Sequence, residues 1–392
     1  MNLPDTRRTI LIGAETYPPD INGAARFAHR LAHGLSGRGH EVHVVAPSPV
    51  GRPVVETFDG VTVHGLRSFR YPAHESLRVV TPWHAAAAVG RLLDEIQPDV
   101  VHTQGHFLVG RGMVSATARR GYPLVATNHL MPENVLAYLP IPGSLTETFA
   151  AWAGRDAGRV YRKAQIVTAP TPRAVDLLVA RAGLTEAIAV SNGIDSAHFA
   201  APPRGATTEP KILFVGRLDA EKRVDELIRA VAMLPEGTPG RVEIVGKGGQ
   251  SAALAALADD LGVSHRVTFR GFVPDDELVA TYAEADIFCI PSIAELQSLV
   301  TLEAMSSGLP VVAADAMALP HLVRPGVNGW LYTPGDVREL ANRLGDLLTD
   351  ADLRHRMGAA SRELVVAHAE DGTLDAFEMI YEKVQSMRAV AV

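Results

Sequence analysis

Two glutamates eight residues apart, Glu295 and Glu303, suit the recognition of an extended polar ligand. Glu295 follows an apolar run, residues 286–290, that predicts a buried strand, and Glu303 belongs to a helical pattern that ends before Pro310. A loop from a strand into a helix leaves backbone N–H groups free to bind an anion such as a pyrophosphate. On one continuous helix the carboxylates would lie roughly 12 Å apart, whereas a hydrolytic pair needs about 5–9.5 Å. We therefore expect the two glutamates to contact different parts of one ligand, where a helical carboxylate can accept hydrogen bonds from sugar hydroxyls.

Two cations follow a second apolar run, residues 211–215, and stand beside Gly216. The guanidinium of Arg217 can bind two phosphate oxygens at once, and the ammonium of Lys222 is a compact positive charge. Together they would neutralise the charge that grows on a departing diphosphate, so that the bond to the diphosphate could break without Mg²⁺. We therefore expect a diphosphate site here that requires no metal and no cofactor.

These residues belong to a chain that alternates short β-branched runs with longer helical patterns, which predicts parallel sheets with crossover helices. Strands are expected at residues 9–12, 41–46, 61–66, 99–102, 123–127 and 165–169, and then at 211–215, 241–245, 266–269, 286–290 and 310–313. A helix is expected at 24–35. The predicted fold class is α/β, with two doubly wound, Rossmann-like domains. Because ligands of such sheets bind beyond the carboxyl ends of the strands, the domains are expected to face a central cleft.

Composition and charge argue against several classes of protein. The 392 residues are 47% hydrophobic and 21% charged, and the net charge of −7 argues against a nucleic-acid binder. Residues 1–198 carry +3 (19 basic against 16 acidic), so this half could face an acidic substrate or an anionic membrane. Cys289 is the one cysteine, which excludes an intrachain disulfide, and no apolar run approaches the ~18 residues of a membrane span. We expect a cytoplasmic protein, at most peripheral at the inner face of the membrane.

The stretch from Glu295 to Val311 resembles the Glu-x7-Glu signature of retaining glycosyltransferases of the GT-B fold, family 4, also called glycosyltransferase group 1. The segment after Gly216 is similar to that family's Gly-Arg-Leu-x-x-x-Lys-Gly motif, although Arg223 replaces its last glycine. The resemblance implies that Glu303 holds the ribose of a sugar nucleotide and that Glu295 is a catalytic residue near the donor sugar. It also implies that the backbone amides after Glu295 bind sugar and phosphate, namely those of Gln297, Ser298 and Leu299.

The resemblance divides the chain into an acceptor-binding domain, residues 1–198, and a donor-binding domain, residues 211–375. Residues 199–210 between them, rich in Ala and Pro, are expected to be a linker. The last helix, residues 376–392, is expected to cross back onto the first domain.

The first half holds two further candidate sites. Gly23 follows the first strand, where a backbone amide at a helix start can approach the donor diphosphate. Two strand ends, one with His102 and His106 and one with His129, look like the histidine segments of bacterial lipid glycosyltransferases, especially those that glycosylate diacylglycerol. The match implies a catalytic His129 near the reacting carbon, whereas His102 and His106 fit a structural role equally well. That subgroup often has Gly where this chain has Ser298, which leaves the sugar open.

Residues and resemblance together predict a retaining transferase that moves a hexose from a nucleotide-diphosphate sugar, UDP-sugar favoured, to a hydroxyl acceptor such as diacylglycerol. The alternative is a GDP-mannose or UDP-GlcNAc transferase to a small soluble acceptor. Two further alternatives are a nucleotide-sugar epimerase of the same architecture and a non-catalytic sugar-nucleotide binder. The expected partners are the nucleotide sugar and the acceptor, with no nucleic acid. A helix predicted at 144–163 carries Arg155, Arg159 and Arg162 beside two aromatic residues, and it either packs on a neighbouring domain or contacts anionic lipid.

Overall fold

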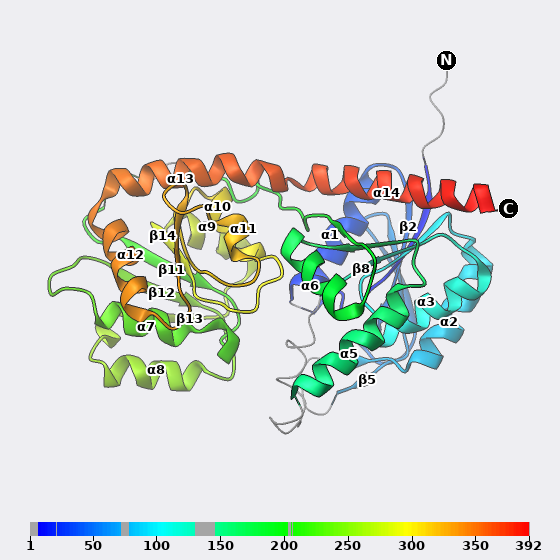
Figure 1. Ribbon diagram of the computed structural model, residues 1–392, viewed down its shortest axis with the longest axis horizontal. Coiled ribbons are helices and arrows are strands. Elements are labelled where there is room, and N and C mark those ends of the chain that lie inside the picture. The colour runs from blue at the N-terminus through cyan, green and yellow to red at the C-terminus, as the bar shows by residue number, and fades with distance from the viewer. Residues whose placement is uncertain are drawn as a thin grey trace, which may run out of the picture. The chain divides into compact units, whose positions relative to one another are not determined.

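The computed structural model describes residues 7–20, 22–71, 78–129, 146–202, 205 and 207–391, and Figure 1 shows its two units. Unit 1 comprises Met1–Ser191 and Asp371–Val392, and unit 2 comprises Asn192–Glu370. Each unit has its own parallel sheet and its own hydrophobic core. The predicted fold class, α/β with two Rossmann-like sheets, is confirmed.

The sheet of unit 1 has eight strands in the order β10-β9-β8-β7-β1-β2-β4-β3, and every neighbouring pair except β3–β4 is parallel. Its strands are β1 (Thr9–Gly13), β2 (Glu41–Pro47), β3 (Val54–Phe58), β4 (Val61–Leu66), β7 (Val100–Thr103), β8 (Leu124–Thr127), β9 (Ile166–Ala169) and β10 (Ile188–Ala189). A separate two-stranded ribbon joins β5 (Phe69–Arg70) to β6 (Arg78–Val79). The helices of this unit are α1 (Gly23–Gly37), α2 (Pro82–Ile96), α3 (Leu108–Arg120), α5 (Thr146–Tyr161), α6 (Pro172–Ala182) and α14 (Glu370–Ala391).

Helices cover both faces of this sheet. Because successive side chains of a strand point to opposite faces, Leu11 and Ile12 of β1 serve different apolar layers. Ile12 packs in the layer that contains Phe27 of α1 and Phe377 of α14. Leu11 packs in the layer that contains Leu93 of α2. The last helix of the chain is therefore part of the core of unit 1.

The sheet of unit 2 has six strands in the order β13-β12-β11-β14-β15-β16, and all of its neighbouring pairs are parallel. Its strands are β11 (Lys211–Val215), β12 (Arg241–Val245), β13 (Val267–Gly271), β14 (Ile287–Ile290), β15 (Val311–Ala314) and β16 (Gly329–Tyr332). Its helices are α7 (Val224–Ala232), α8 (Ser251–Asp260), α9 (Asp275–Ala283), α10 (Leu299–Ser306), α11 (Leu319–Leu322), α12 (Val337–Thr349) and α13 (Ala351–Val365). This strand order is that of a doubly wound nucleotide-binding sheet.

The unit boundaries differ from those expected at residues 198 and 375. The chain enters unit 2 after Ser191 and leaves it after Glu370. Phe199, placed in the linker by its composition, is buried in the core of unit 2, and its carbonyl accepts a hydrogen bond from Ser307 Oγ at 2.8 Å. Apolar burial therefore moves the first boundary ahead of the Pro-rich stretch. Among the described residues, no helix combines the length and apolar character needed to cross a bilayer.

Candidate active site

The candidate donor site of unit 2 lies where the strand order reverses, between β11 and β14. β11 pairs with β12 on one side and with β14 on the other, so the loops after β11 and β14 leave the same edge of the sheet. These loops contact each other, because Ile293 N–H donates to the Glu221 carbonyl at 3.0 Å. Ligands of open α/β sheets bind at such a switch point, and the predicted donor residues occupy both loops.

Lys222 and Glu295 form an ion pair across this switch point. Lys222 Nζ lies 2.5 Å from Glu295 Oε1, and the two side chains are only 16% and 11% exposed. Burial by itself raises the pKa of Glu295, but the charge and hydrogen bond of Lys222, a hydrogen bond from Ser292 and the charge of Arg217 together lower it below its ordinary value. A buried carboxylate that stays ionised beside a cation is a common feature of functional sites. The structure thus brings together two predicted residues that stand far apart in the sequence.

Arg217, the second predicted diphosphate cation, also has carboxylate partners. It forms ion pairs with Asp219 and, at 3.2 Å, with Glu221, and its side chain is 48% exposed. Exposed ion pairs contribute little free energy, so a phosphate can replace these carboxylates at low cost. Its binding of a diphosphate stays a prediction.

Glu303 is held inside the unit by a residue that the sequence did not single out. Glu303 is 2% exposed on α10, and Tyr282 of α9 donates its hydroxyl to Glu303 Oε2 at 2.8 Å. Helix α10 begins at Leu299 with Ser298 as its N-cap, so residues 295–303 are not one helix. Glu295 is therefore a loop residue and Glu303 lies in the second turn of α10. No sequence pattern distinguishes Tyr282 from other apolar positions of its helix.

The three predicted amides after Glu295 differ in their surroundings. The Gln297 side chain accepts a hydrogen bond from Asn192 N–H at 2.7 Å, which fixes the start of unit 2. Ser298 Oγ accepts from Thr301 Oγ1 at 2.8 Å. Within the described part of the chain, the backbone N–H groups of Ser298 and Leu299 donate no hydrogen bond. Buried N–H groups at a helix start that lack a protein acceptor favour an anion there.

The glycines around the switch point serve the packing of the protein's own loops. A Cβ on Gly246 would lie 1.8 Å from the carbonyl oxygen of Gly216, and one on Gly248 would lie 2.4 Å from that of Leu218. Gly246 also has φ +136°, which L side chains rarely adopt. The close approach of both glycines is to the loop after β11.

The surroundings of Arg223 show why an arginine stands where the family motif has glycine. Its φ is +52°, the left-handed region where glycine is favoured. Its guanidinium forms an ion pair with Glu226, whose side chain is only 2% exposed and also accepts from the Tyr332 hydroxyl at 2.7 Å. Arg223 is therefore committed to a buried carboxylate and is not an extra cation for the diphosphate.

The candidate residues of unit 1 gather at the carboxyl ends of β7 and β8. His129 follows β8, its Nε2 lies 2.5 Å from Gln104 Oε1, and its ring lies 4.7 Å from that of Phe27. Burial lowers the pKa of His129 to about 3, so its ring is neutral at physiological pH. His102 is fully buried, with its pKa also lowered to about 3 by burial and then by His129. Gln104 is a contact that the sequence prediction missed.

His106 and Gly23 have defined structural surroundings. His106 Nδ1 lies 3.0 Å from the Tyr161 hydroxyl, and burial lowers its pKa to about 4. Gly23 is the first residue of α1, and Asn22 caps this helix by accepting from Ala25 N–H at 2.9 Å. The approach of Gly23 and His129 to a donor stays a prediction. The described residues contain no group of three or more His, Cys, Asp or Glu side chains placed to hold a metal ion.

Comparison with known proteins agrees with this fold. Residues 21–198 match Glycosyltransferase Family 4, and residues 198–364 match Glycosyl transferases group 1. The chain belongs to this family: it is a glycosyltransferase of GT-B type that uses a nucleotide-sugar donor.

Among its relatives is a GDP-mannose-dependent alpha-mannosyltransferase of Mycobacterium tuberculosis, 30% identical over 97% of both chains. Sulfoquinovosyl transferase SQD2 of Arabidopsis thaliana is 30% identical over 86% of this chain and 66% of its own. The solved sucrose-phosphate synthase from Thermosynechococcus elongatus has a TM-score of 0.81 at 20% identity, covering 97% of this chain and all of its own. That structure shows the fold that the two chains share.

Proposed function

We propose that this protein is a retaining glycosyltransferase that moves a hexose from a UDP-sugar to a hydroxyl acceptor. The observation that carries the proposal is the Lys222–Glu295 ion pair at the switch point of unit 2. The N–H groups of Ser298 and Leu299 follow it in the same loop, and Glu303 lies in the second turn of the helix that they open. This order matches sugar, phosphate and ribose along one donor.

The chemistry needs no protein nucleophile. The bond between the sugar C1 and the diphosphate oxygen breaks, and a bond from C1 to the acceptor oxygen forms on the same face. The acceptor proton passes to the departing phosphate oxygen. Lys222 and Arg217 stabilise the negative charge of the leaving diphosphate, so no metal ion is required. Glu303 accepts hydrogen bonds from the ribose, and Glu295, held ionised by Lys222, orients the sugar.

A lipid is the acceptor that we favour, because unit 1 carries a basic groove. The groove has a volume of about 890 Å³ and lies between α5 and α6. Arg155, Arg159, Arg162 and Arg181 line it. Among the described residues, Arg155 and Arg159 have no ion-pair partner, and Trp152 on the same helix is 52% exposed. A basic helix with an exposed aromatic side chain suits peripheral contact with an anionic bilayer.

Vesicle flotation tests the membrane contact. The wild-type protein should float with vesicles that contain phosphatidylglycerol and stay behind with neutral vesicles. The R155A/R159A variant should lose this binding. R241A removes a surface arginine of unit 2 that pairs with Glu209 at 2.7 Å and serves as the matched control. Equal flotation of R155A/R159A and R241A would remove the groove from the proposal.

A second candidate is transfer of mannose from GDP-mannose to a small soluble acceptor. It is favoured by the 30% identity to the M. tuberculosis alpha-mannosyltransferase, which extends over 97% of both chains. Incubation with UDP-glucose, UDP-GlcNAc or GDP-mannose, each with diacylglycerol vesicles or with soluble acceptors, distinguishes the two candidates. Transfer from GDP-mannose alone would select the second.

Variations of this transfer assay test the stereochemistry, the metal dependence and the two remaining alternatives. The anomeric configuration of the product, read by NMR, should match that of the donor, since inversion would exclude the same-face mechanism. Activity should persist in EDTA. A donor-only incubation should leave the sugar unchanged, because its interconversion would indicate an epimerase. Donor binding without transfer to any acceptor would indicate a non-catalytic binder.

A further inference from the structure

The candidate histidine His129 ends a buried polar chain that reaches the last helix of the protein. Gln104 Oε1 lies 2.5 Å from His129 Nε2, and the Gln104 amide nitrogen lies 3.3 Å from His102 Nε2. His102 Nδ1 lies 2.8 Å from the Tyr381 hydroxyl of α14, and His102 Nε2 lies 2.6 Å from Thr127 Oγ1. Gln104 and His102 are 4% and 0% exposed. The positions of these side chains are therefore set by one another rather than by solvent.

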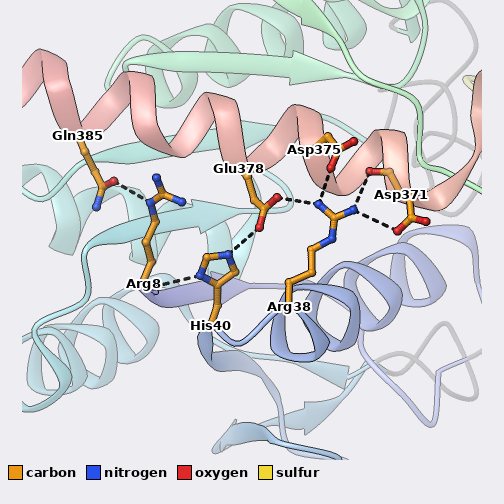
Figure 2. Close-up of polar contacts among 7 residues, drawn as sticks. All are labelled: Arg8, Arg38, His40, Asp371, Asp375, Glu378 and Gln385. Carbon is orange, nitrogen blue, oxygen red and sulfur yellow. Dashed lines mark hydrogen bonds and ion pairs between the residues drawn. The ribbon is translucent and has the colours of Figure 1, made fainter. Parts of the chain in front are cut away.

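Helix α14 is fixed against the rest of unit 1 by a second, charged set of contacts, shown in Figure 2. Arg38 binds Asp375 at 2.6 Å and Glu378 at 2.7 Å. His40 Nδ1 accepts from the Arg8 backbone N–H at 3.1 Å, so its Nε2 is free to donate to Glu378 at 2.8 Å. These contacts hold the N-terminal half of α14 in place.

Apolar contacts of the same helix lie against the histidines. The Phe377 ring lies 5.0 Å from that of His102 and 6.0 Å from that of Phe27, which in turn contacts His129. Among the described residues, the charged contacts of α14 and its contacts with the histidines thus belong to one docking surface. A change in the position of α14 would displace both Tyr381 and Phe377.

We infer that α14 positions His129 through Tyr381, His102 and Gln104, and that Gln104 fixes the His129 tautomer with its proton on Nε2. An amide oxygen only accepts hydrogen bonds, so the ring nitrogen facing it must carry the hydrogen. The neutral ring then presents an unprotonated Nδ1, which accepts a hydrogen bond from a hydroxyl. The burial that lowers the pKa of both histidines keeps this arrangement neutral. His129 is in this account an acceptor toward a sugar hydroxyl and not a proton donor.

This inference rests on the proposed function only for the identity of the hydroxyl, so its first test does not use activity. Protein labelled with [¹⁵N]histidine is examined by long-range ¹H–¹⁵N correlation, in which the two nitrogen shifts report the tautomer, and H129Q assigns the signal. The wild type should show the proton on Nε2. Q104L should convert His129 to a mixture of tautomers, and Q104N serves as a second variant if Q104L folds poorly.

Y381F tests the more remote part of the chain of contacts. It should shift the nitrogen signals of His102 and, less strongly, those of His129. The matched control is Y122F, which removes a hydroxyl that donates to the Leu93 carbonyl at 3.0 Å in the same unit. A wild-type His129 protonated on Nδ1, or nitrogen shifts that are the same in Q104L and the wild type, would overturn the inference.

The second test uses the pH dependence of transfer. Q104E places a carboxylate against His129 Nε2, which favours the imidazolium and raises the pKa of His129 by about 1–3 units. Among the described residues, His102 is the titratable group coupled to His129, which itself helps to lower the pKa of His102. The kcat/KM of Q104E should therefore fall on the acid side at a higher pH than that of the wild type. Y381F should lower kcat about fivefold, the loss of one neutral hydrogen bond.

The two tests fail separately. If no nucleotide sugar supports transfer, the proposed function fails, while the nitrogen shifts still decide the positioning of His129. If transfer occurs and the acid limb of Q104E coincides with that of the wild type, the positioning role fails and the proposed function stands.

Discussion

The Lys222–Glu295 ion pair yields a prediction in which stability and activity separate. Replacing either partner leaves the other charge poorly solvated, because the side chains are only 16% and 11% exposed. Replacing both with methionine removes the two charges together and leaves apolar side chains of similar length. We therefore expect K222M and E295M each to be less stable than the double variant K222M/E295M.

The magnitude follows from the geometry. Two unit charges at the 2.5 Å separation of Nζ and Oε1 attract by roughly 5–7 kcal/mol at an effective dielectric constant of about 20. The desolvation of both ions offsets most of this attraction, so that removing the whole buried pair is often nearly neutral. Removing one partner costs about 3–5 kcal/mol, and the partial exposure of this pair places it near the lower value. Single losses of about 3 kcal/mol each and a double loss near zero give an expected coupling energy of about 6 kcal/mol.

Hydrogen exchange of the β11 and β14 amides in the full chain is the suitable measurement, because two units do not share one two-state transition. A double variant that loses the sum of the two single losses would refute the reasoning about burial. Activity provides the second readout. K222M/E295M should fold well and yet transfer sugar at least about 100-fold more slowly, and its calorimetric affinity for UDP should fall. Transfer at the wild-type rate would refute the proposed site.

Three further predictions concern the same unit. The pKa of Glu295 is lowered from its ordinary value of 4.5, so the wild type should lose stability as the pH falls below 4.5 and through the lowered pKa. In thermal scans over that pH interval, E295Q should lose less stability. R223G should relieve about 1 kcal/mol of backbone strain. It should also leave the buried carboxylate of Glu226 without its cationic partner, which costs about 3–5 kcal/mol. It should therefore melt lower, and added E226Q should restore most of the loss. G246A should lower the melting temperature by roughly 5 °C or more, whereas G249A, with open space around its Cβ, should leave it unchanged.

Most of the fold was predictable because parallel strands buried on both faces are continuous apolar runs. Each of the eleven predicted strands lies within two residues of an observed one at either end. The strands β3 (Val54–Phe58), β10 (Ile188–Ala189) and β16 (Gly329–Tyr332) were not predicted, because an edge strand needs apolar residues on fewer faces. The compact unit that begins at Asn192 includes Phe199, which composition placed in the linker, because composition reports a linker but not the burial of one side chain.

The candidate site was predictable at the level of residue types and not at the level of partners. Motif spacing identified Lys222 and Glu295 separately, and only the parallel pairing of β11 with β14 brings their loops together. Tyr282, Gln104 and Tyr381 were missed because each acts through a tertiary contact and belongs to no local pattern. A hydrogen bond between residues 104 and 129, or 102 and 381, has no signature in a single sequence.

Burial also orders the three cations near the switch point by what each can do for a ligand. Arg223 is bound to the buried Glu226 and cannot leave it without a large desolvation cost. Arg217 is half exposed, so a phosphate can displace its carboxylate partners cheaply. Lys222 is mostly buried, but its ammonium has three donors and can hold Glu295 while it binds a phosphate oxygen. The sequence counts three equivalent positive charges, whereas burial ties Arg223 to the fold and leaves the proposed binding of a diphosphate to Arg217 and Lys222.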